Sequence, residues 1–125
     1  MEEKPKILVV DDDEDYRAIV GAALERSGYG VLIADNISDA YQIAQAERPD
    51  AAVIDNKLEI KGDGLGLACR LDKGGLVSKC NIIGMSGTPY VGDEWAKRGF
   101  GLFMYKPFGI DYLRKLVEEA LNIRR

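Results

Sequence analysis

Five short apolar runs alternate along the chain with longer segments whose apolar residues recur at helical spacing. The runs occupy residues 6–10, 30–34, 51–54, 81–85 and 100–105. Strict alternation of this kind is typical of a parallel sheet, because the connection between two parallel strands needs a helix that packs back on the sheet. The sequence therefore predicts an α/β fold with one doubly wound, five-stranded parallel sheet and helices on both faces.

The segments between the runs carry helix signals of unequal strength. The helices are expected from Asp13 to near Gly28, from Asn36 or Ser38 to Ala46, over 64–72, over 90–98, and around an apolar face formed by Ile110, Leu113, Leu116, Val117, Ala120 and Leu121. The face of the first helix that should pack on the sheet holds Tyr16, Ile19, Val20, Ala23 and Leu24. The segment 90–98 is short and contains Gly92, so we expect a weak helix there.

Length and charge limit what the chain can be. At 125 residues it has the size of one ordinary domain, and residues 1–125 are expected to fold as a single one. No apolar run approaches the roughly 20 residues that cross a bilayer. The N-terminus also lacks the layout of a signal peptide, so we expect a cytoplasmic protein without a membrane partner. The net charge is −4 and Arg124-Arg125 is a weak basic signal, so direct nucleic-acid binding is not expected.

The chain contains no histidine. This removes imidazole-based acid–base catalysis, serine–histidine–aspartate triads and histidine-ligated metals. Cys69 and Cys80 form no metal-binding pattern, and we expect both to be reduced and buried or half-buried. Any chemistry in this chain must use carboxylates, hydroxyls and lysine, with or without a hard cation.

Polar side chains follow four of the five predicted strands. They are Asp11 and Asp12 after the first strand, Asp55 after the third, Ser86 after the fourth and Lys106 after the fifth. Open parallel sheets bind ligands beyond the carboxyl ends of their strands, so these side chains are expected to meet in one crevice.

Three carboxylates in one crevice repel one another, and burial strengthens the repulsion. Mg²⁺ resolves this conflict because it prefers oxygen ligands, and Lys106 supplies a further positive charge. Such a set suits phosphoryl transfer, which needs positioning and charge neutralisation and can proceed through an aspartyl phosphate. We predict that Asp55 accepts the phosphoryl group, that Asp11 and Asp12 hold Mg²⁺, and that Lys106 and Ser86 contact the phosphoryl oxygens.

Four segments of the sequence resemble the signature segments of response-regulator receiver domains. They are Val9-Val10-Asp11-Asp12, Ile54-Asp55, Met85-Ser86-Gly87 and Tyr105-Lys106-Pro107-Phe108. The resemblance extends over essentially the whole chain. It implies a flavodoxin-like sheet with strand order 2-1-3-4-5. It also implies a signalling switch of a two-component system, phosphorylated by a sensor histidine kinase or a histidine phosphotransfer protein.

The resemblance assigns roles to individual residues. Asp12 and Asp55 would bind Mg²⁺ directly, Asp11 would bind it through water, and the backbone carbonyl of Lys57 would complete the protein ligands. Ser86 and Phe103 would form the switch pair, in which the hydroxyl moves to the phosphate and the aromatic ring turns inward. The signal would pass through the surface of the fourth helix, fifth strand and fifth helix to a downstream protein or output domain. Such a domain phosphorylates and dephosphorylates itself and is not an enzyme with an external substrate.

The chain departs from the family pattern after Asp55. Glu59 stands where proline is usual, and the segment up to Asp63-Gly64 is one residue longer than usual. Lys57 places a second cation at the mouth of the site and is expected to alter autodephosphorylation by interfering with the attacking water.

The last third of the chain is rich in aromatic residues. Either most of them pack in the core, or they form a surface whose packing changes when Ser86 contacts the phosphate. Trp95, on the weak fourth helix, is the best exposed candidate and the expected reporter of the switch.

Two alternatives to the switch remain open. Asp11-Asp12-Asp13 contains an Asp-x-Asp pattern after a first strand, as in haloacid-dehalogenase-type phosphatases. No second acidic pair follows Lys106, however, and there is no room for a cap domain. The other alternative is an interaction domain of the same fold that is never phosphorylated.

Overall fold

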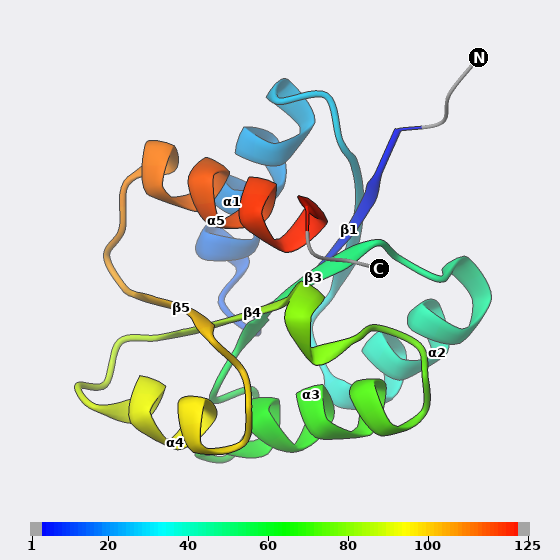
Figure 1. The fold of residues 1–125 in the computed structure, drawn as a ribbon. Coiled ribbons are helices and arrows are strands. Elements are labelled where there is room, and N and C mark those ends of the chain that lie inside the picture. Colours follow the sequence, from blue (N-terminus) through cyan, green and yellow to red (C-terminus); the bar gives the residue numbers. More distant parts are fainter. Residues whose placement is uncertain (1–3, 123–125) are drawn as a thin grey trace.

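A five-stranded parallel sheet with strand order β2-β1-β3-β4-β5 forms the centre of the computed structural model (Figure 1). The structure describes residues 4–122, so the Arg124-Arg125 pair and the first three residues lie outside it. The strands are β1 Lys6–Val10, β2 Gly30–Ala34, β3 Ala51–Asp55, β4 Ile82–Ser86 and β5 Leu102–Tyr105. The predicted fold class and strand order are confirmed.

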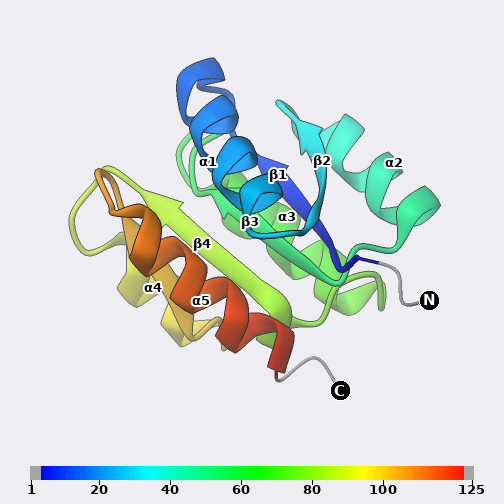
Figure 2. The same cartoon turned by 90° about the horizontal axis from the view of Figure 1, so that it is seen from above.

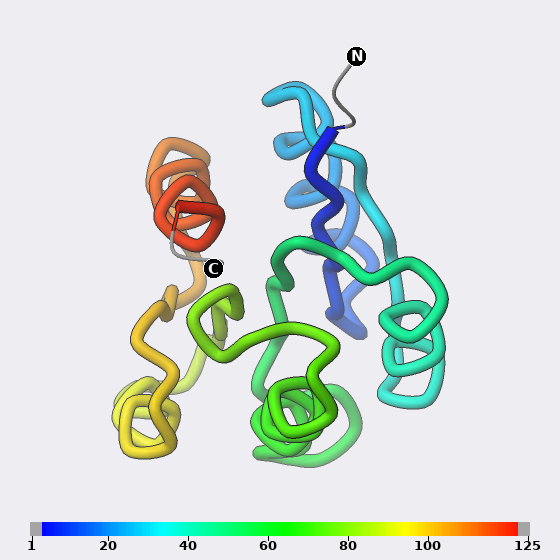
Figure 3. Tube along the Cα trace, turned by 45° about the vertical axis from the view of Figure 1, so that its right-hand side comes forward, coloured from blue at the N-terminus to red at the C-terminus, as the bar shows by residue number. Residues whose placement is uncertain are grey.

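Five α-helices and one short 3₁₀ turn connect the strands. They are α1 Glu14–Arg26, α2 Ile37–Glu47, α3 Asp63–Lys73, η1 Lys79–Asn81, α4 Val91–Lys97 and α5 Ile110–Asn122. Helices α1 and α5 cover one face of the sheet, and α2, α3 and α4 cover the other (Figure 2). The tube in Figure 3 shows the same division, with α5 and α1 on one side of the sheet and α3 and α4 on the other. None of the helices within residues 4–122 is long and apolar enough to span a membrane.

The sheet separates the core into two clusters of buried residues, one under each helical layer. Every residue of β3 and β4 is buried, because both strands are covered on both faces. Strand register aligns the carboxyl ends, pairing Val10 with Ile54, Asp55 with Met85, and Ser86 with Tyr105. The residues at and just after these ends therefore lie along one edge of the sheet.

Some boundaries differ from the sequence-based expectation. The fourth strand begins at Ile82, because Asn81 belongs to η1 and its buried side-chain amide donates to the carbonyl of Ala120 at 2.6 Å. The fifth strand begins at Leu102, and Phe100 is buried outside the strand against the indole of Trp95.

Two expectations about burial were wrong. Ile19 is 52% exposed, because it lies on the outer flank of α1 beside a groove between α1 and α5 that nothing in residues 4–122 fills. The buried residues of α1 are Val20, Gly21, Ala23 and Leu24. Cys80 is exposed in η1, whereas Cys69 is half-buried as expected.

Candidate functional site

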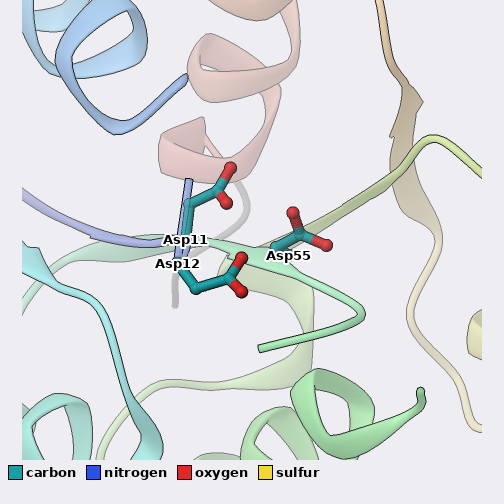
Figure 4. Close-up of side chains that lie close together, drawn as sticks. All are labelled: Asp11, Asp12 and Asp55. Carbon is teal, nitrogen blue, oxygen red and sulfur yellow. The ribbon is translucent and has the colours of Figure 1, made fainter. Parts of the chain in front are cut away.

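Three aspartates meet at the carboxyl ends of β1 and β3. Asp11 and Asp12 follow β1 directly, and Asp55 is the last residue of β3. One carboxylate oxygen from each lies within 4.8 Å of the others (Figure 4). Asp11 is fully buried and Asp55 is only 7% exposed, whereas Asp12 faces solvent. The sequence therefore placed these carboxylates correctly at one edge of the sheet.

Lys106 lies between the two buried carboxylates. Its ammonium nitrogen is 2.9 Å from Oδ2 of Asp11 and 2.5 Å from Oδ2 of Asp55. The backbone N–H of Lys106 donates to the carbonyl of Ser86 at 2.8 Å, which continues the ladder between β4 and β5 and fixes the start of this side chain. The predicted meeting of Lys106 with Asp11 and Asp55 is therefore present in the structure.

Each buried carboxylate also accepts a hydrogen bond from the backbone two residues ahead. Oδ1 of Asp11 accepts from the Asp13 amide at 2.9 Å, and Oδ1 of Asp55 accepts from the Lys57 amide at 3.0 Å. These bonds close the turn after each strand. Each carboxylate thus has one oxygen on its own loop and the other on Lys106. The Lys57 side chain is exposed, and the metal-ligand role of its carbonyl stays a prediction.

The charges of the site are not balanced. Burial raises the pKa of Asp11, hydrogen bonds from Lys106 and the Asp13 amide lower it, and the charge of Asp55 raises it again, with a net rise. Burial lowers the pKa of Lys106, but hydrogen bonds and charge from Asp11 and Asp55 outweigh it, and the net shift is upward. One ammonium therefore faces three carboxylates, an arrangement that favours a further cation.

Ser86 ends β4 and is buried at the same edge of the sheet. Its Oγ accepts a hydrogen bond from the Thr88 amide at 2.9 Å, so the hydroxyl proton is free to be donated. The structure thus brings Ser86 to the edge where Asp55 and Lys106 lie, as predicted.

The ring of Phe103 lies in a slot that two glycines leave open under α4. A Cβ on Gly84 would come within 2.6 Å of this ring, and one on Gly92 within 3.0 Å. The ring centroid is 5.6 Å from that of Trp95 and 5.0 Å from that of Tyr105. Phe103 is half-buried in this position, and its motion in a switch stays a prediction.

Trp95 is fully buried, so the expectation that it is exposed was wrong. Its side chain and that of Val91, one turn earlier, form the buried side of α4. The indole N–H donates to Oδ1 of Asn56 at 2.9 Å. Asn56 is buried directly after Asp55, and sequence reasoning missed it. The signal was available, because Val91 and Trp95 are four residues apart and define one face of a helix.

The loop after β3 depends on two further residues that sequence reasoning did not single out as functional. The carboxylate of Asp63 accepts hydrogen bonds from the amides of Leu58, Glu59 and Ile60 at 2.7 to 3.1 Å. Gly64 packs so closely on the end of β3 that a Cβ there would lie 1.8 Å from the carbonyl oxygen of Asp55. Together they set the path of the chain after the acceptor position.

The sequence profile of the response regulator receiver domain matches residues 7–118. The chain belongs to the response regulator receiver domain family. It therefore belongs to the signalling domains of two-component response regulators, proteins that receive phosphoryl groups from histidine kinases.

Relatives of the receiver domain include regulators of several kinds. An NtrX-like response regulator of Rickettsia bellii is 33% identical over 122 residues, which cover 95% of this chain and 25% of the relative. The alkaline phosphatase synthesis transcriptional regulatory protein PhoP of Bacillus subtilis is 33% identical over 103 residues, which cover 82% of this chain and 42% of that protein. The receiver chain thus spans less than half the length of these relatives.

Solved structures agree with the receiver fold. The receiver domain of NtrX from Brucella abortus superposes with a TM-score of 0.84 at 28% identity, covering 94% of this chain and 98% of that one. The chemotaxis protein CheY4 of Vibrio cholerae superposes with a TM-score of 0.82 at 23% identity, covering 95% of this chain and 100% of that one. The latter likeness concerns the fold alone.

Proposed function

We propose that this receiver domain is a phosphorylation-dependent switch in which Asp55 accepts a phosphoryl group from a sensor histidine kinase or a histidine phosphotransfer protein. The observation that carries the proposal is the position of Asp55. Its carboxylate ends the central strand, is nearly buried, contacts the Lys106 ammonium and lies among two further carboxylates. Burial of a carboxylate in this way lowers the stability of the fold, so stability does not explain it, whereas the arrangement suits an activated nucleophile.

The acidic cluster fits Mg²⁺. Its donors are hard carboxylate oxygens within 4.8 Å of one another, and the site stays negative after Lys106 is counted. Asp12 and Asp55 would bind the ion directly, Asp11 through a water molecule, and the Lys57 carbonyl would complete the protein ligands. When bound, Mg²⁺ would neutralise charge on the phosphoryl oxygens.

The transfer step uses residues that the fold has already assembled. An oxygen of the Asp55 carboxylate forms a bond to phosphorus while the bond from phosphorus to the donor imidazole nitrogen breaks. The imidazole leaves with that electron pair and takes up a proton. Lys106 would then pair with a phosphoryl oxygen in place of Oδ2 of Asp55, and Ser86 would donate its hydroxyl proton to another. Hydrolysis returns the carboxylate and inorganic phosphate, and Lys57 would interfere with the attacking water.

The output of the switch would pass through Ser86 and Phe103. Movement of the Ser86 hydroxyl toward the phosphoryl group changes the packing around β4, and Phe103 lies on the next strand against Trp95 of α4. We expect residues 1–125 to act as a single cytoplasmic module. Its partner would be a downstream protein or output domain that recognises the surface of α4, β5 and α5.

The experiment that tests the proposal measures thermal stability with Mg²⁺ and beryllofluoride, a mimic of the phosphoryl group. A ligand at 100 times its dissociation constant stabilises a protein by about 2.7 kcal/mol. We expect this gain in the wild type and its loss in Asp55→Asn. Asp93→Asn makes the same chemical change on the exposed side of α4 and should keep the full gain. If neither reagent changes the thermal stability of the wild type, phosphorylation of Asp55 is contradicted and the alternative of an interaction domain that is never phosphorylated is supported.

A further inference from the structure

We propose that Tyr16 is a positioning residue for phosphoryl transfer: the face of its ring holds the Lys106 ammonium in the site when the carboxylates change partners. The inference rests on the proposed function of Asp55. It adds to that function a residue of α1 that lies outside the sheet edge from which the other site residues come.

The observation behind the proposal is the place of the Lys106 ammonium over the Tyr16 ring. The nitrogen lies 4.2 Å from the ring centroid, within the range of about 6 Å over which a cation is attracted to an aromatic face. The Lys106 side chain is only 14% exposed, so water screens the attraction little. The ammonium is thus bound on three sides, by Asp11, Asp55 and the ring.

Two of these three partners would change, one when Mg²⁺ binds and one when the phosphoryl group is transferred. Asp55 becomes an acyl phosphate and loses its carboxylate charge. Asp11 would accept a hydrogen bond from a water molecule on the bound Mg²⁺. Among the interactions of the Lys106 ammonium within residues 4–122, the contact with the Tyr16 ring is the one that neither Mg²⁺ binding nor phosphoryl transfer alters. A lysine side chain has a long flexible stem, so it needs such a contact to stay beside the reacting group.

Tyr16 is itself held relative to the site. It lies in the first turn of α1, where the Asp13 side chain accepts from the amides of Asp15 and Tyr16 as the N-cap. The Asp13 amide in turn donates to Oδ1 of Asp11. The first turn of α1 is thereby tied to one of the two carboxylates that bind Lys106.

A second aromatic side chain supports the Tyr16 ring. The ring of Phe108, two residues after Lys106, lies with its centroid 5.9 Å from that of Tyr16 and is tilted by 47°. Tyr16 therefore connects the loop after β1 with the loop after β5, and Lys106 lies at this junction.

The competing explanation is that Tyr16 only packs against Phe108. Three variants separate the two roles. Tyr16→Phe and Tyr16→Trp keep an aromatic face for the ammonium, whereas Tyr16→Leu keeps apolar volume without that face. If Tyr16 positions Lys106, the aromatic replacements should keep the phosphorylation rate and Tyr16→Leu should lower it. If Tyr16 only packs against Phe108, the rates of the variants should follow their stabilities instead.

The test combines two measurements. The first is the rate constant of Asp55 phosphorylation at saturating acetyl phosphate and Mg²⁺, followed by intact mass. We expect Tyr16→Phe near the wild-type rate and Tyr16→Leu about 3- to 30-fold slower, the range that a partly desolvated cation–π contact implies. The second is the NMR shift of the Lys106 ε-methylene protons without donor or metal. An aromatic ring at position 16 should move these signals upfield in wild type, Tyr16→Phe and Tyr16→Trp, but not in Tyr16→Leu.

The outcomes are distinguishable. Wild type that takes no phosphoryl group overturns both the proposed function and the role of Tyr16. If wild type is phosphorylated, two results overturn the role of Tyr16 alone. One is that Tyr16→Leu is phosphorylated as fast as wild type, and the other is that Tyr16→Phe is as slow as Tyr16→Leu. The Mg²⁺ affinity of Tyr16→Leu, measured by calorimetric titration, is the control. A loss of Mg²⁺ affinity as large as the loss of rate shows a structural role and also overturns the positioning role. If Tyr16→Leu does not fold, Lys106 methylene shifts in wild type at the values of an exposed lysine overturn the contact by themselves.

Discussion

Single residues decide how charge is balanced in this site. Within residues 4–122, Lys106 provides the one ammonium that pairs with the buried Asp11 and Asp55, and it would compete with a metal ion for the same oxygens. Charged groups at such short range interact strongly because water is partly excluded. The pKa of Asp11 is raised even with Lys106 present, which shows that one ammonium does not offset burial and the charge of Asp55.

Replacing Lys106 by methionine should therefore separate metal binding from phosphoryl transfer. We expect Lys106→Met to bind Mg²⁺ about tenfold more tightly, a gain of ~1.4 kcal/mol, because a like charge has been removed from the site. Phosphorylation should at the same time become slower, since the ammonium that neutralises the phosphoryl group is missing. Calorimetric titration with Mg²⁺ measures the first effect. Lys97→Met, on the exposed side of α4, is the matched control and should bind Mg²⁺ like wild type. Equal or weaker Mg²⁺ binding by Lys106→Met would contradict this picture.

A glycine supports the acceptor position from behind. An alanine Cβ at Gly64 would lie 1.8 Å from the carbonyl oxygen of Asp55, so either α3 or the end of β3 must move. We expect Gly64→Ala to lower the free energy of unfolding by about 1–3 kcal/mol and to slow phosphorylation of Asp55. Gly66→Ala is the matched control in the same helix, because its Cβ would meet nothing within 4 Å. That control should be neutral or stabilising by up to about 1 kcal/mol. Urea denaturation measures the free energy of unfolding of both variants. Equal stability of Gly64→Ala and Gly66→Ala would refute the steric argument.

At the scale of elements, the loop between β3 and α3 depends on one carboxylate. Asp63 accepts from three amides of this loop, and it does so in the first turn of α3, where a negative charge is favourable. Burial raises the pKa of Asp63, but the hydrogen bonds from the amides of Leu58, Glu59, Ile60 and Gly64 lower it, with a net decrease from the ordinary value of 3.8. The charged form is therefore the one that holds the loop.

The sign of this shift gives a pH dependence. A group whose pKa is lower in the folded state stabilises the fold above its unfolded value and loses that contribution as pH falls through the folded value. We expect Asp63→Asn to be less stable than wild type at pH 7. The difference in free energy of unfolding should shrink as the pH falls below 3.8, when the wild-type carboxyl also becomes neutral. Denaturant titrations at several pH values measure it. A difference that does not change with pH would show that the charge of Asp63 is irrelevant.

A buried hydrogen bond joins helix α4 to Asn56, the residue directly after the acceptor strand β3. Trp95→Phe would remove the donor and leave Oδ1 of Asn56 without it in the core. We expect a loss of about 1–3 kcal/mol in the free energy of unfolding. A double-mutant cycle with Asn56→Ala isolates this bond from the loss of indole volume, because the second replacement should cost less once Trp95 is absent. Strictly additive losses would mean that the bond contributes nothing.

At the scale of the whole molecule, contacts from the acceptor position reach both helical layers. On one side, Asp55 contacts Lys106, and Lys106 contacts Tyr16 of α1 and lies two residues before Phe108. On the other side, Asn56 contacts Trp95 of α4, which packs against Phe103. A change at Asp55 thus has a route to each face of the sheet, and each route consists of packed, partly buried side chains.

The parallel sheet explains why residues so distant in sequence meet. Lys106 and Asp11 are 95 positions apart and are nevertheless hydrogen-bonded. All five strands point the same way, so their carboxyl ends share one edge, and β1, β3, β4 and β5 each bring a polar residue to it.

The amino-acid sequence by itself determined the fold class, the strand order through the family resemblance, and the meeting of Asp11, Asp12, Asp55, Ser86 and Lys106. The fold class and the meeting of these residues follow from periodicity and from the position of each residue at the end of a strand, both of which are local in the chain. Helix and strand limits were also close, and the errors at Asn81 and Phe100 arose at ends, where side chains pack against other elements.

The tertiary structure alone decided which side chains touch. The burial of Trp95, its bond to Asn56 and the contact of Tyr16 with Lys106 each join segments that are distant along the chain. The close approach of Gly64 to Asp55 joins two consecutive elements, but it depends on how α3 packs against the end of β3. Sequence periodicity shows which face of a helix is apolar, but it does not show which neighbour covers that face or how completely. Ile19 lies on the apolar face expected for the first helix and is nevertheless exposed. Trp95 was the aromatic residue expected to be best exposed and is buried. In both cases coverage depends on how the helices pack on the sheet.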